Sequence, residues 1–468
     1  MEENEKIKLF EQASIPNAVA KLAVPMIFSS LVMVLYNMAD TYFVGMLNNP
    51  VENAAVSLAA PVLLAFNAVN NLFGVGTSSM MSRALGRRDY ETVSQSSAFG
   101  FYCSLISGVL FGLLCGLFHN PLLMLIGADE TTRAATQGYM FWTVYLGAAP
   151  AILNVVMAYL VRSEGAAMHA SIGTMSGCIL NIILDPVFIL PWGFNMGAAG
   201  AGLATFLSNC VACLYFFVLL YVKRKSTFVC INPKKFSLRK NIIKEVCGVG
   251  IPASIQNLLN VTGMTILNNF TSAYGADAVA AMGITYKIYM VPMQVALGFS
   301  QGIMPLISYT FASGNRKRMK STILFAMKIV VPVLAAVTVI YYVGAEGLIT
   351  LFMRNESIIA YGSKFLRGFC LGLTFLGVDF LAVGVFQALG LGRYALVFAI
   401  MRKVALEIPA LFILNRLFPL YGIAYAQFAA ELILSVCAVV ILRHIFRKYG
   451  DVKSFRKQSA LRKTKSST

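Results

Sequence analysis

Long apolar runs separated by short polar segments dominate this chain of 468 residues, of which 58% are hydrophobic and only 12% are charged. About twelve of the runs reach some 20 residues, the length that a helix needs to cross the hydrocarbon core of a bilayer. The pattern therefore predicts an all-α polytopic membrane protein with twelve transmembrane helices. The predicted spans are residues 17–46, 54–82, 91–118, 133–161, 167–190, 198–222, 246–274, 277–311, 321–345, 357–388, 394–415 and 421–446.

The order of proline, glycine and other small residues repeats after about 222–230 residues. Pro25 corresponds to Pro252, and Gly200-x3-Ala204 corresponds to a second glycine and alanine at 422 and 426. Since each half holds an even number of spans, we expect two six-helix lobes related by a parallel pseudo-two-fold repeat around a central cleft. The predicted parts are an N-terminal segment 1–15, a lobe 16–222, a basic linker 223–245, a second lobe 246–446 and a basic tail 447–468.

The net charge is +18, and the basic residues are placed along the chain as in a membrane protein and not as in a nucleic-acid-binding surface. Lys and Arg gather in the termini and in alternate loops, such as 83–88 and 223–244, whereas the loops Asn48–Asn53 and Trp192–Gly197 contain none. By the positive-inside rule, both termini are expected in the cytoplasm. The first apolar run is too long for a cleavable signal peptide. We expect the tail from 443 to 468 to be disordered and able to lie on anionic lipid.

The most informative polar residue in an apolar run is Asp185, which lies between Ala170 and Pro191. A carboxylate inside a membrane span is unfavourable by roughly 2.5–3.5 kcal/mol, so it normally faces a cavity or a partner. Asn181 precedes it by four residues and shares its helix face. Two oxygen-bearing side chains on one face could hold a proton or Na+. The alternative is a polar pair that hydrogen-bonds a neighbouring helix.

The second half of the chain carries different charges. Ile408 occupies the position that matches Asp185, and Leu267 lies near the position that matches Asp40. The second half instead holds Asp379, Glu407 and Glu431. Lys403 lies one helical turn before Glu407, which predicts an ion pair that lowers the cost of inserting both charges. Glu431 can pair with a neighbouring helix in the same way.

Several short motifs occur in a fixed order along this duplicated chain. They are Pro25 with Asp40-Thr41-x-x-Val44-Gly45, Gly76-x5-Ser82-Arg83-x-Leu85-Gly86, Asn181-x3-Asp185-Pro186, Gly200-x3-Ala204-Thr205, and Pro305-x-Ile307-Ser308-Tyr309 followed by Gly314. With them, the chain resembles the multidrug and toxic compound extrusion (MATE) family, in its bacterial MepA-like branch, from about residue 15 to 446.

The resemblance implies an antiporter of the bacterial inner (plasma) membrane that exports cationic and amphiphilic drugs, driven by inward H+ or Na+, with no other cofactor. The family's coupling-ion site corresponds here to Asp40, Asn181, Asp185 and Thr205. The proline of the first helix, which is thought to bend when that site changes occupancy, corresponds to Pro25. A proline inside a helix removes one backbone hydrogen bond, which is consistent with a bend.

The drug is expected in the central cleft, where aromatic rings, Met side chains and carboxylates accept cations of many shapes. Tyr36, Asn37 and Met38 are candidates because they lie within a turn of Asp40. Some family members carry a glutamate in the seventh helix, where this chain has Asn260, so a second coupling site of that type is not expected. Asp379 lies near another acidic position of the family.

Three alternatives remain. A lipid-linked oligosaccharide flippase would use cations such as Lys287, Arg402 and Lys403 to hold pyrophosphate. An integral membrane enzyme would need a catalytic or metal motif, yet the three histidines are scattered, so we expect neither catalytic residues nor a structural metal. A channel is disfavoured, because two duplicated halves with different charged residues suggest a transporter that works by alternating access. The expected partners are small substrates and the lipid bilayer, and a monomer is sufficient for this architecture.

Overall fold

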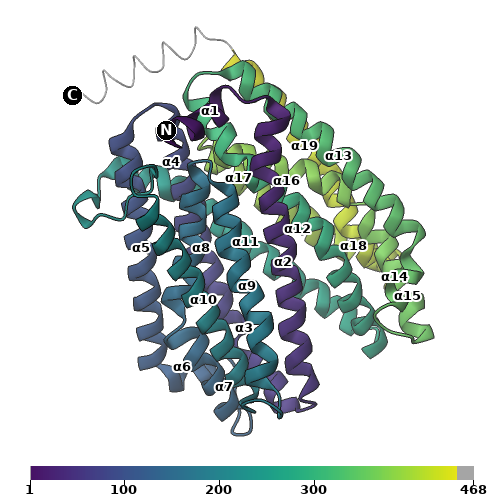
Figure 1. Cartoon of the computed structure of the whole chain (residues 1–468). Coiled ribbons are helices and arrows are strands. Elements are labelled where there is room, and N and C mark those ends of the chain that lie inside the picture. The colour runs from purple at the N-terminus through teal and green to yellow at the C-terminus, as the bar shows by residue number, and fades with distance from the viewer. Residues whose placement is uncertain (1, 451–468) are drawn as a thin grey trace.

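The computed structural model describes residues 2–450, and within this range the chain forms helices, turns and short connections without any strand. Figure 1 shows two helical bundles, one from the purple-to-teal first half of the chain and one from the green-to-yellow second half. Helix α1 and the last described residues, at the end of α19, lie at the same end of the molecule, which we call the termini end. The predicted all-α fold with two lobes is confirmed.

The first half begins with a short helix and continues as the bundle that we call the N lobe, from α2 to α10. Its helices are α1 (Glu2–Glu11), α2 (Ile15–Met46), α3 (Pro50–Asn70), η1 (Asn71–Val75), α4 (Gly76–Gly86), α5 (Tyr90–Leu117), α6 (His119–Leu125), α7 (Arg133–Met140), η2 (Phe141–Tyr145), α8 (Ala148–Ser163), α9 (Ala167–Ile189) and α10 (Gly197–Val222). Here η1 and η2 are wide π-helical turns.

The second half forms the C lobe, from α11 to α19, after a linker that holds the short 3-10 helix η3 (Pro233–Lys235). Its helices are α11 (Lys240–Ser272), α12 (Ala276–Ala312), α13 (Arg316–Val343), α14 (Ala345–Thr350), α15 (Glu356–Cys370), α16 (Leu373–Ala388), α17 (Gly392–Ile400), the π-helical η4 (Met401–Glu407), α18 (Ile408–Leu417) and α19 (Gly422–Gly450). Residues 443–450, which we expected in the disordered tail, instead continue helix α19, and Ile445 in this stretch is only 2% exposed, so packing against the core holds them in the helix. Residues 451–468 of the predicted tail lie outside the described residues.

Helices occupy all twelve predicted positions, although their lengths and breaks differ from the apolar runs. Within residues 2–450, eight helices are long and apolar enough to cross a membrane, and ten if each of two bent pairs counts as one span. The bent pairs are 133–163, with a 43° bend, and 356–388, with a 46° bend. The two remaining positions are α11 and the run from α17 to α18, which carry more polar and charged residues.

The two lobes contact each other closely in the half of the molecule nearer the termini end. Gly302 of α12 lies against α2, because a Cβ at this position would sit 2.7 Å from the Cα atom of Ala23. A Cβ on Gly86 of α4 would likewise meet the backbone oxygen of Tyr309 at 2.4 Å. Only glycine permits such close backbone approach, so these residues bring the lobes together at this end.

Polar contacts join the lobes at the same end. The Ser79 hydroxyl of α4 donates a hydrogen bond to the backbone oxygen of Gln387 on α16, at 2.5 Å. Arg83, one turn further along α4, forms an ion pair with Glu245 of α11 at 3.4 Å. Together with the glycine contacts, these bonds close the interface between the lobes at the termini end.

Candidate functional site

The predicted pair on α9 lies inside the N lobe. Asn181 is 2% exposed and Asp185 is fully buried, and both face α10. The Asn181 amide lies 3.2 Å from the Thr205 hydroxyl of α10 on one side and 2.9 Å from Asp185 Oδ2 on the other. The structure therefore brings together Asn181, Asp185 and Thr205, three of the four residues of the predicted coupling-ion site.

Small residues set this arrangement because they let α9 and α10 approach each other. A Cβ on Gly177 would lie 3.2 Å from the backbone oxygen of Ser208, and one on Gly200 would meet the backbone oxygen of Phe188 at 2.5 Å. Larger side chains at these two positions would push the helices apart. The close packing holds Thr205 within hydrogen-bond distance of Asn181.

The fourth residue, Asp40, comes from α2, which packs against α9. Asp40 is close enough to Asp185 for the two carboxylates to interact electrostatically. Its Oδ1 atom is buried and has no hydrogen-bond partner among the residues that the structure describes. Tyr36, one turn before Asp40, reaches the cluster as well, since its hydroxyl bonds with Thr205. All four predicted residues of the coupling-ion site are therefore neighbours.

One further residue belongs to this cluster and was not predicted. Tyr139 of α7 is 5% exposed and lies near Asp40, Tyr36 and Asp185. A single tyrosine in an apolar run carries no spacing pattern, so nothing in the sequence distinguished it from a packing residue. The site is thus built from α2, α7, α9 and α10, all within the N lobe.

The Asn181 amide can face Asp185 in two orientations. If Nδ2 of Asn181 faces Asp185, it donates to the carboxylate while Oδ1 accepts from the Thr205 hydroxyl and the Thr205 backbone N–H, at 3.2 and 3.1 Å. If Oδ1 faces Asp185 instead, two acceptors meet, and a proton or a cation between them is needed to join them. Both amide orientations keep a hydrogen bond between Asn181 and Thr205.

The other predicted residues lie outside this cluster. Asn37 is exposed on α2 and donates a hydrogen bond to the backbone oxygen of Met33 at 2.9 Å. Met38 and Asn260 are half-buried, on α2 and α11 respectively. Pro25 is buried inside α2, which runs as one continuous helix from Ile15 to Met46.

Asp379 belongs to a separate, buried group of charges in the C lobe. It lies beside Glu431, which forms an ion pair with Arg402. Lys403 and Glu407 form the predicted ion pair at 2.6 Å, within the π-helical turn η4. Asp379 is 1% exposed, and its carboxyl group lies against that of Glu431. The expected pairing of Lys403 with Glu407 is confirmed, and Glu431 pairs with a neighbouring helix.

Comparisons with known proteins agree with this architecture. The MatE family model matches twice, at residues 25–187 and 252–413, which confirms the internal repeat. The multidrug export protein MepA of Staphylococcus saprophyticus is 34% identical over 94% of this chain and 96% of its own, and MepA of Staphylococcus aureus is 33% identical over the same shares.

Solved structures of similar fold cover nearly the whole chain. A multidrug resistance MATE family transporter of the MOP superfamily, in an outward-facing conformation, has a TM-score of 0.89 and 27% identity, and the match covers 95% of this chain and 99% of that one. A MOP superfamily transporter from Pyrococcus furiosus has a TM-score of 0.88 and 27% identity over 96% and 99%. The reverse polarity of its binding pocket is described as suggesting a different function.

Proposed function

Since this chain belongs to the MatE family, we propose that it is a secondary active multidrug efflux transporter, which exports cationic and amphiphilic compounds by antiport with H+ or Na+ through alternating access. The name of the MepA relatives supports the export of drugs. The observation that carries the coupling mechanism is the buried contact of Asp185 with Asn181, beside Asp40. Two carboxylates in one buried cluster repel each other unless a proton or a cation compensates them.

In this proposal the orientation of the Asn181 amide depends on whether Asp185 is ionised. An ionised Asp185 accepts a hydrogen bond from Nδ2, whereas a protonated Asp185 donates to Oδ1 at the same position. Na+ would also bind the Oδ1 orientation, because hard cations prefer oxygen ligands. When the amide rotates, the Asn181 atom that faces Thr205 changes between the Oδ1 acceptor and the Nδ2 donor, so the Thr205 hydroxyl must change its own hydrogen bonds. Because the Tyr36 hydroxyl of α2 bonds with Thr205, the rotation also alters a contact of α2. Occupancy of the site thereby alters the contacts of the helix that packs against the other lobe.

The basic residues support a cytoplasmic position for both termini, by the positive-inside rule. With that orientation, the close contacts at the termini end seal the cytoplasmic side, and the protein is outward-facing. Drug would then bind between the lobes on the opposite side of this seal, where Tyr36, Asn37 and Met38 lie on α2. For exchange to be enforced, proton or Na+ binding must favour one facing state and the drug the other.

The C-lobe charges have a different role in this proposal. Arg402 and Lys403 are each paired with a carboxylate, which lowers the cost of burying them. Asp379 is a third carboxylate beside these two ion pairs, so we assign it to this buried C-lobe group and not to drug contact. Asn260 of α11 remains a candidate for drug contact, because it is half-buried on a helix that packs against the N lobe.

A lipid-linked oligosaccharide flippase is the second candidate function. It would require free cations to hold pyrophosphate. Two of the three cations named for that role, Arg402 and Lys403, are instead bound to Glu431 and Glu407. Their pairing favours the exporter.

Expression in a drug-sensitive bacterial host separates the two functions. An exporter should raise the tolerated concentration of ethidium and similar cations, and an inactive variant such as Asp185→Asn should not. A flippase would leave the tolerance to ethidium unchanged in both cases. Equal tolerance of cells with the wild type, the variant and an empty vector, at equal amounts of protein in the membrane, would contradict the proposed drug export.

A further inference from the structure

The short helix α1 lies across the termini end and contacts both lobes (Figure 1). Its Phe10 side chain is fully buried, and the ring stacks on that of Tyr309 of α12, with 4.8 Å between the centroids. Gly165 of the N lobe lies at the tip of the ring, where a Cβ would be 2.9 Å from the Phe10 Cζ atom. Phe10 therefore fills a space between the lobes, and separating them here would expose the ring.

Polar groups of the C lobe bind the end of α1, where Glu11 also forms an exposed ion pair with Arg88 of the N lobe at 3.4 Å. The Tyr309 hydroxyl donates a hydrogen bond to Glu11 at 2.7 Å. Arg318 of α13 donates to the backbone oxygens of Phe10 and Ala13 at 2.7 and 2.5 Å. The last carbonyls of a helix have no partner within the helix and attract positive charge, so Arg318 caps α1 from the opposite lobe.

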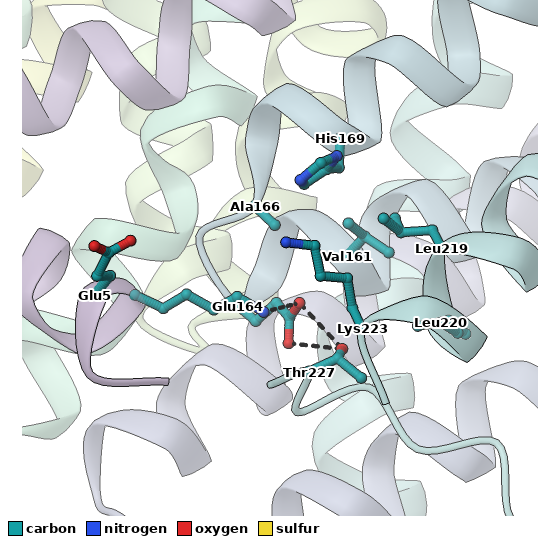
Figure 2. Close-up of a pocket in the computed structure, with 10 residues that line it drawn as sticks. Glu5, Val161, Glu164, Ala166, His169, Leu219, Leu220, Lys223 and Thr227 are labelled. Carbon is teal, nitrogen blue, oxygen red and sulfur yellow. Dashed lines mark hydrogen bonds and ion pairs between the residues drawn. The ribbon is translucent and has the colours of Figure 1, made fainter. Parts of the chain in front are cut away.

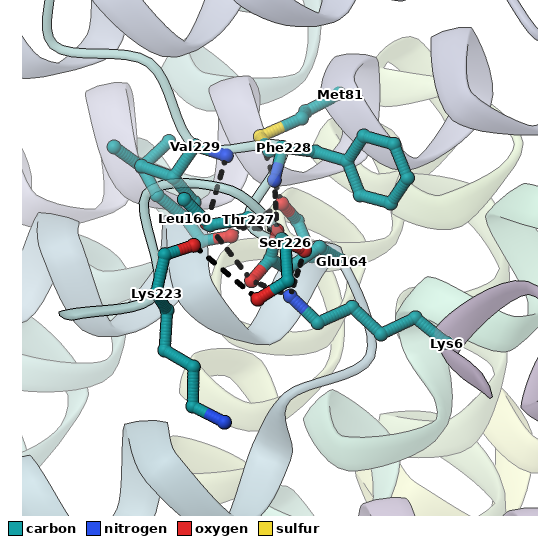
Figure 3. Close-up of polar contacts among 10 residues, drawn as sticks. Lys6, Met81, Leu160, Glu164, Lys223, Ser226, Thr227, Phe228 and Val229 are labelled. Carbon is teal, nitrogen blue, oxygen red and sulfur yellow. Dashed lines mark hydrogen bonds and ion pairs between the residues drawn. The ribbon is translucent and has the colours of Figure 1, made fainter. Parts of the chain in front are cut away.

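The beginning of α1 is anchored on the N lobe and the linker instead. Lys6 forms an ion pair with Glu164 at 2.6 Å, and the Glu164 side chain is only 3% exposed. Figure 3 shows that the same carboxylate accepts hydrogen bonds from Thr227 and from the backbone N–H of Phe228. A cavity of about 200 Å³ lies beside this anchor, lined by Lys6, Glu164 and Thr227 among others (Figure 2). The anchor joins α1 to elements that belong to the N-lobe side of the molecule.

We propose that α1 is a latch that holds the two lobes together at the termini end. It remains on the N lobe through Lys6 and Glu164, and it binds the C lobe through Phe10, Glu11 and the carbonyls that Arg318 caps. When the lobes separate at this end, the contacts to Tyr309 and Arg318 must break. The latch therefore stabilises the state in which this end is closed, and it sets the ratio of closed to open protein. This inference rests on the alternating access proposed above.

Two substitutions weaken the latch with little change in packing. Tyr309→Phe keeps the ring that stacks on Phe10 and removes only the hydroxyl that binds Glu11, so we expect it to fold. Arg318→Gln removes the cation that caps α1. The matched control is Lys317→Gln, because Lys317 is exposed, adjacent to Arg318 and loses the same charge.

Distances between two spin labels test the latch in the full-length protein in lipid nanodiscs. Unnatural amino acids at the exposed positions Arg87 and Lys320 carry the labels, one on each lobe, so that the native cysteines remain. A hydrogen bond to a charged group is stronger than one between neutral groups. Each latch variant should therefore raise the ratio of long to short distances roughly tenfold, equivalent to about 1.4 kcal/mol, and Lys317→Gln should not.

The wild type, measured at two pH values and with and without ethidium, separates the possible failures. If the wild-type distances respond to these conditions but both latch variants keep the wild-type ratio, the latch is wrong while alternating access stands. An equal shift in Lys317→Gln would also overturn the latch, since general charge would then explain it. If the wild-type distances never change, alternating access fails and the latch with it.

Discussion

Replacing Gly302 with alanine should open the termini end. The new Cβ would sit 2.7 Å from the Cα atom of Ala23 and 2.9 Å from the backbone oxygen of Leu22. Both are backbone atoms of α2, so they cannot rotate away as a side chain could. Relieving the overlap requires α12 and α2 to move apart. Overpacking of this kind costs about 1–3 kcal/mol, and that cost falls on the state in which the lobes are closed here. The ratio of closed to open protein should fall by roughly 5- to 150-fold.

The matched control is Gly283→Ala in the same helix, where a Cβ would meet no atom within 4 Å. Both substitutions exchange a helical glycine for alanine and bring the same gain in helix propensity, about 0.8–1 kcal/mol. Spin-label distances between the lobes should increase for Gly302→Ala and stay at the wild-type values for Gly283→Ala. A wild-type distance distribution for Gly302→Ala would refute the reasoning, because the interface would then not depend on this close approach.

Further predictions concern the coupling site, the proline of α2 and the C-lobe charges. Asp40→Asn and Asp185→Asn should each abolish dye export by protein that is folded and inserted; export near the wild-type rate by both would exclude the N-lobe site. Pro25→Ala should slow dye transport more than it weakens dye binding, because a fully hydrogen-bonded helix resists bending, and an unchanged turnover would make Pro25 a packing residue. Lys403→Met leaves the buried Glu407 carboxylate without its ion-pair partner and should lower the free energy of unfolding by about 3–5 kcal/mol. The double variant Lys403→Met with Glu407→Leu should recover most of the lost stability in thermal unfolding. If Lys403→Met alone were as stable as the wild type, the prediction would be contradicted.

The sequence predicted the part of the site that lies on one helix. Asn181 and Asp185 are four residues apart, so their shared face follows from helix geometry alone. Thr205 and Asp40 come from other helices, and only the family resemblance connected them with this pair. Tyr139 was missed because a contact between helices leaves no spacing pattern in the sequence.

The same distinction holds for charges and for short helices. The ion pair of Lys403 with Glu407 follows from their spacing. Glu431 was expected to pair with a neighbouring helix, but the sequence could not identify Arg402 as its partner, because the two residues lie on separate elements. Helix α1 was expected only as part of the N-terminal segment 1–15, since an isolated helix of ten residues is marginal in water. Tertiary contacts of Phe10 and Arg318 account for its position, and apolar periodicity carries no information about such contacts.

Uptake of a fluorescent cationic dye into everted vesicles tests the central claim most directly. A pH gradient and a Na+ gradient are imposed separately, and the wild type is compared with Asp185→Asn at equal amounts of inserted protein. We expect one gradient to drive uptake by the wild type, which would also identify the coupling ion, and the variant to lose that uptake. If neither gradient moves dye in vesicles where a known exporter works, the antiporter is contradicted and lipid-linked substrates should be tested.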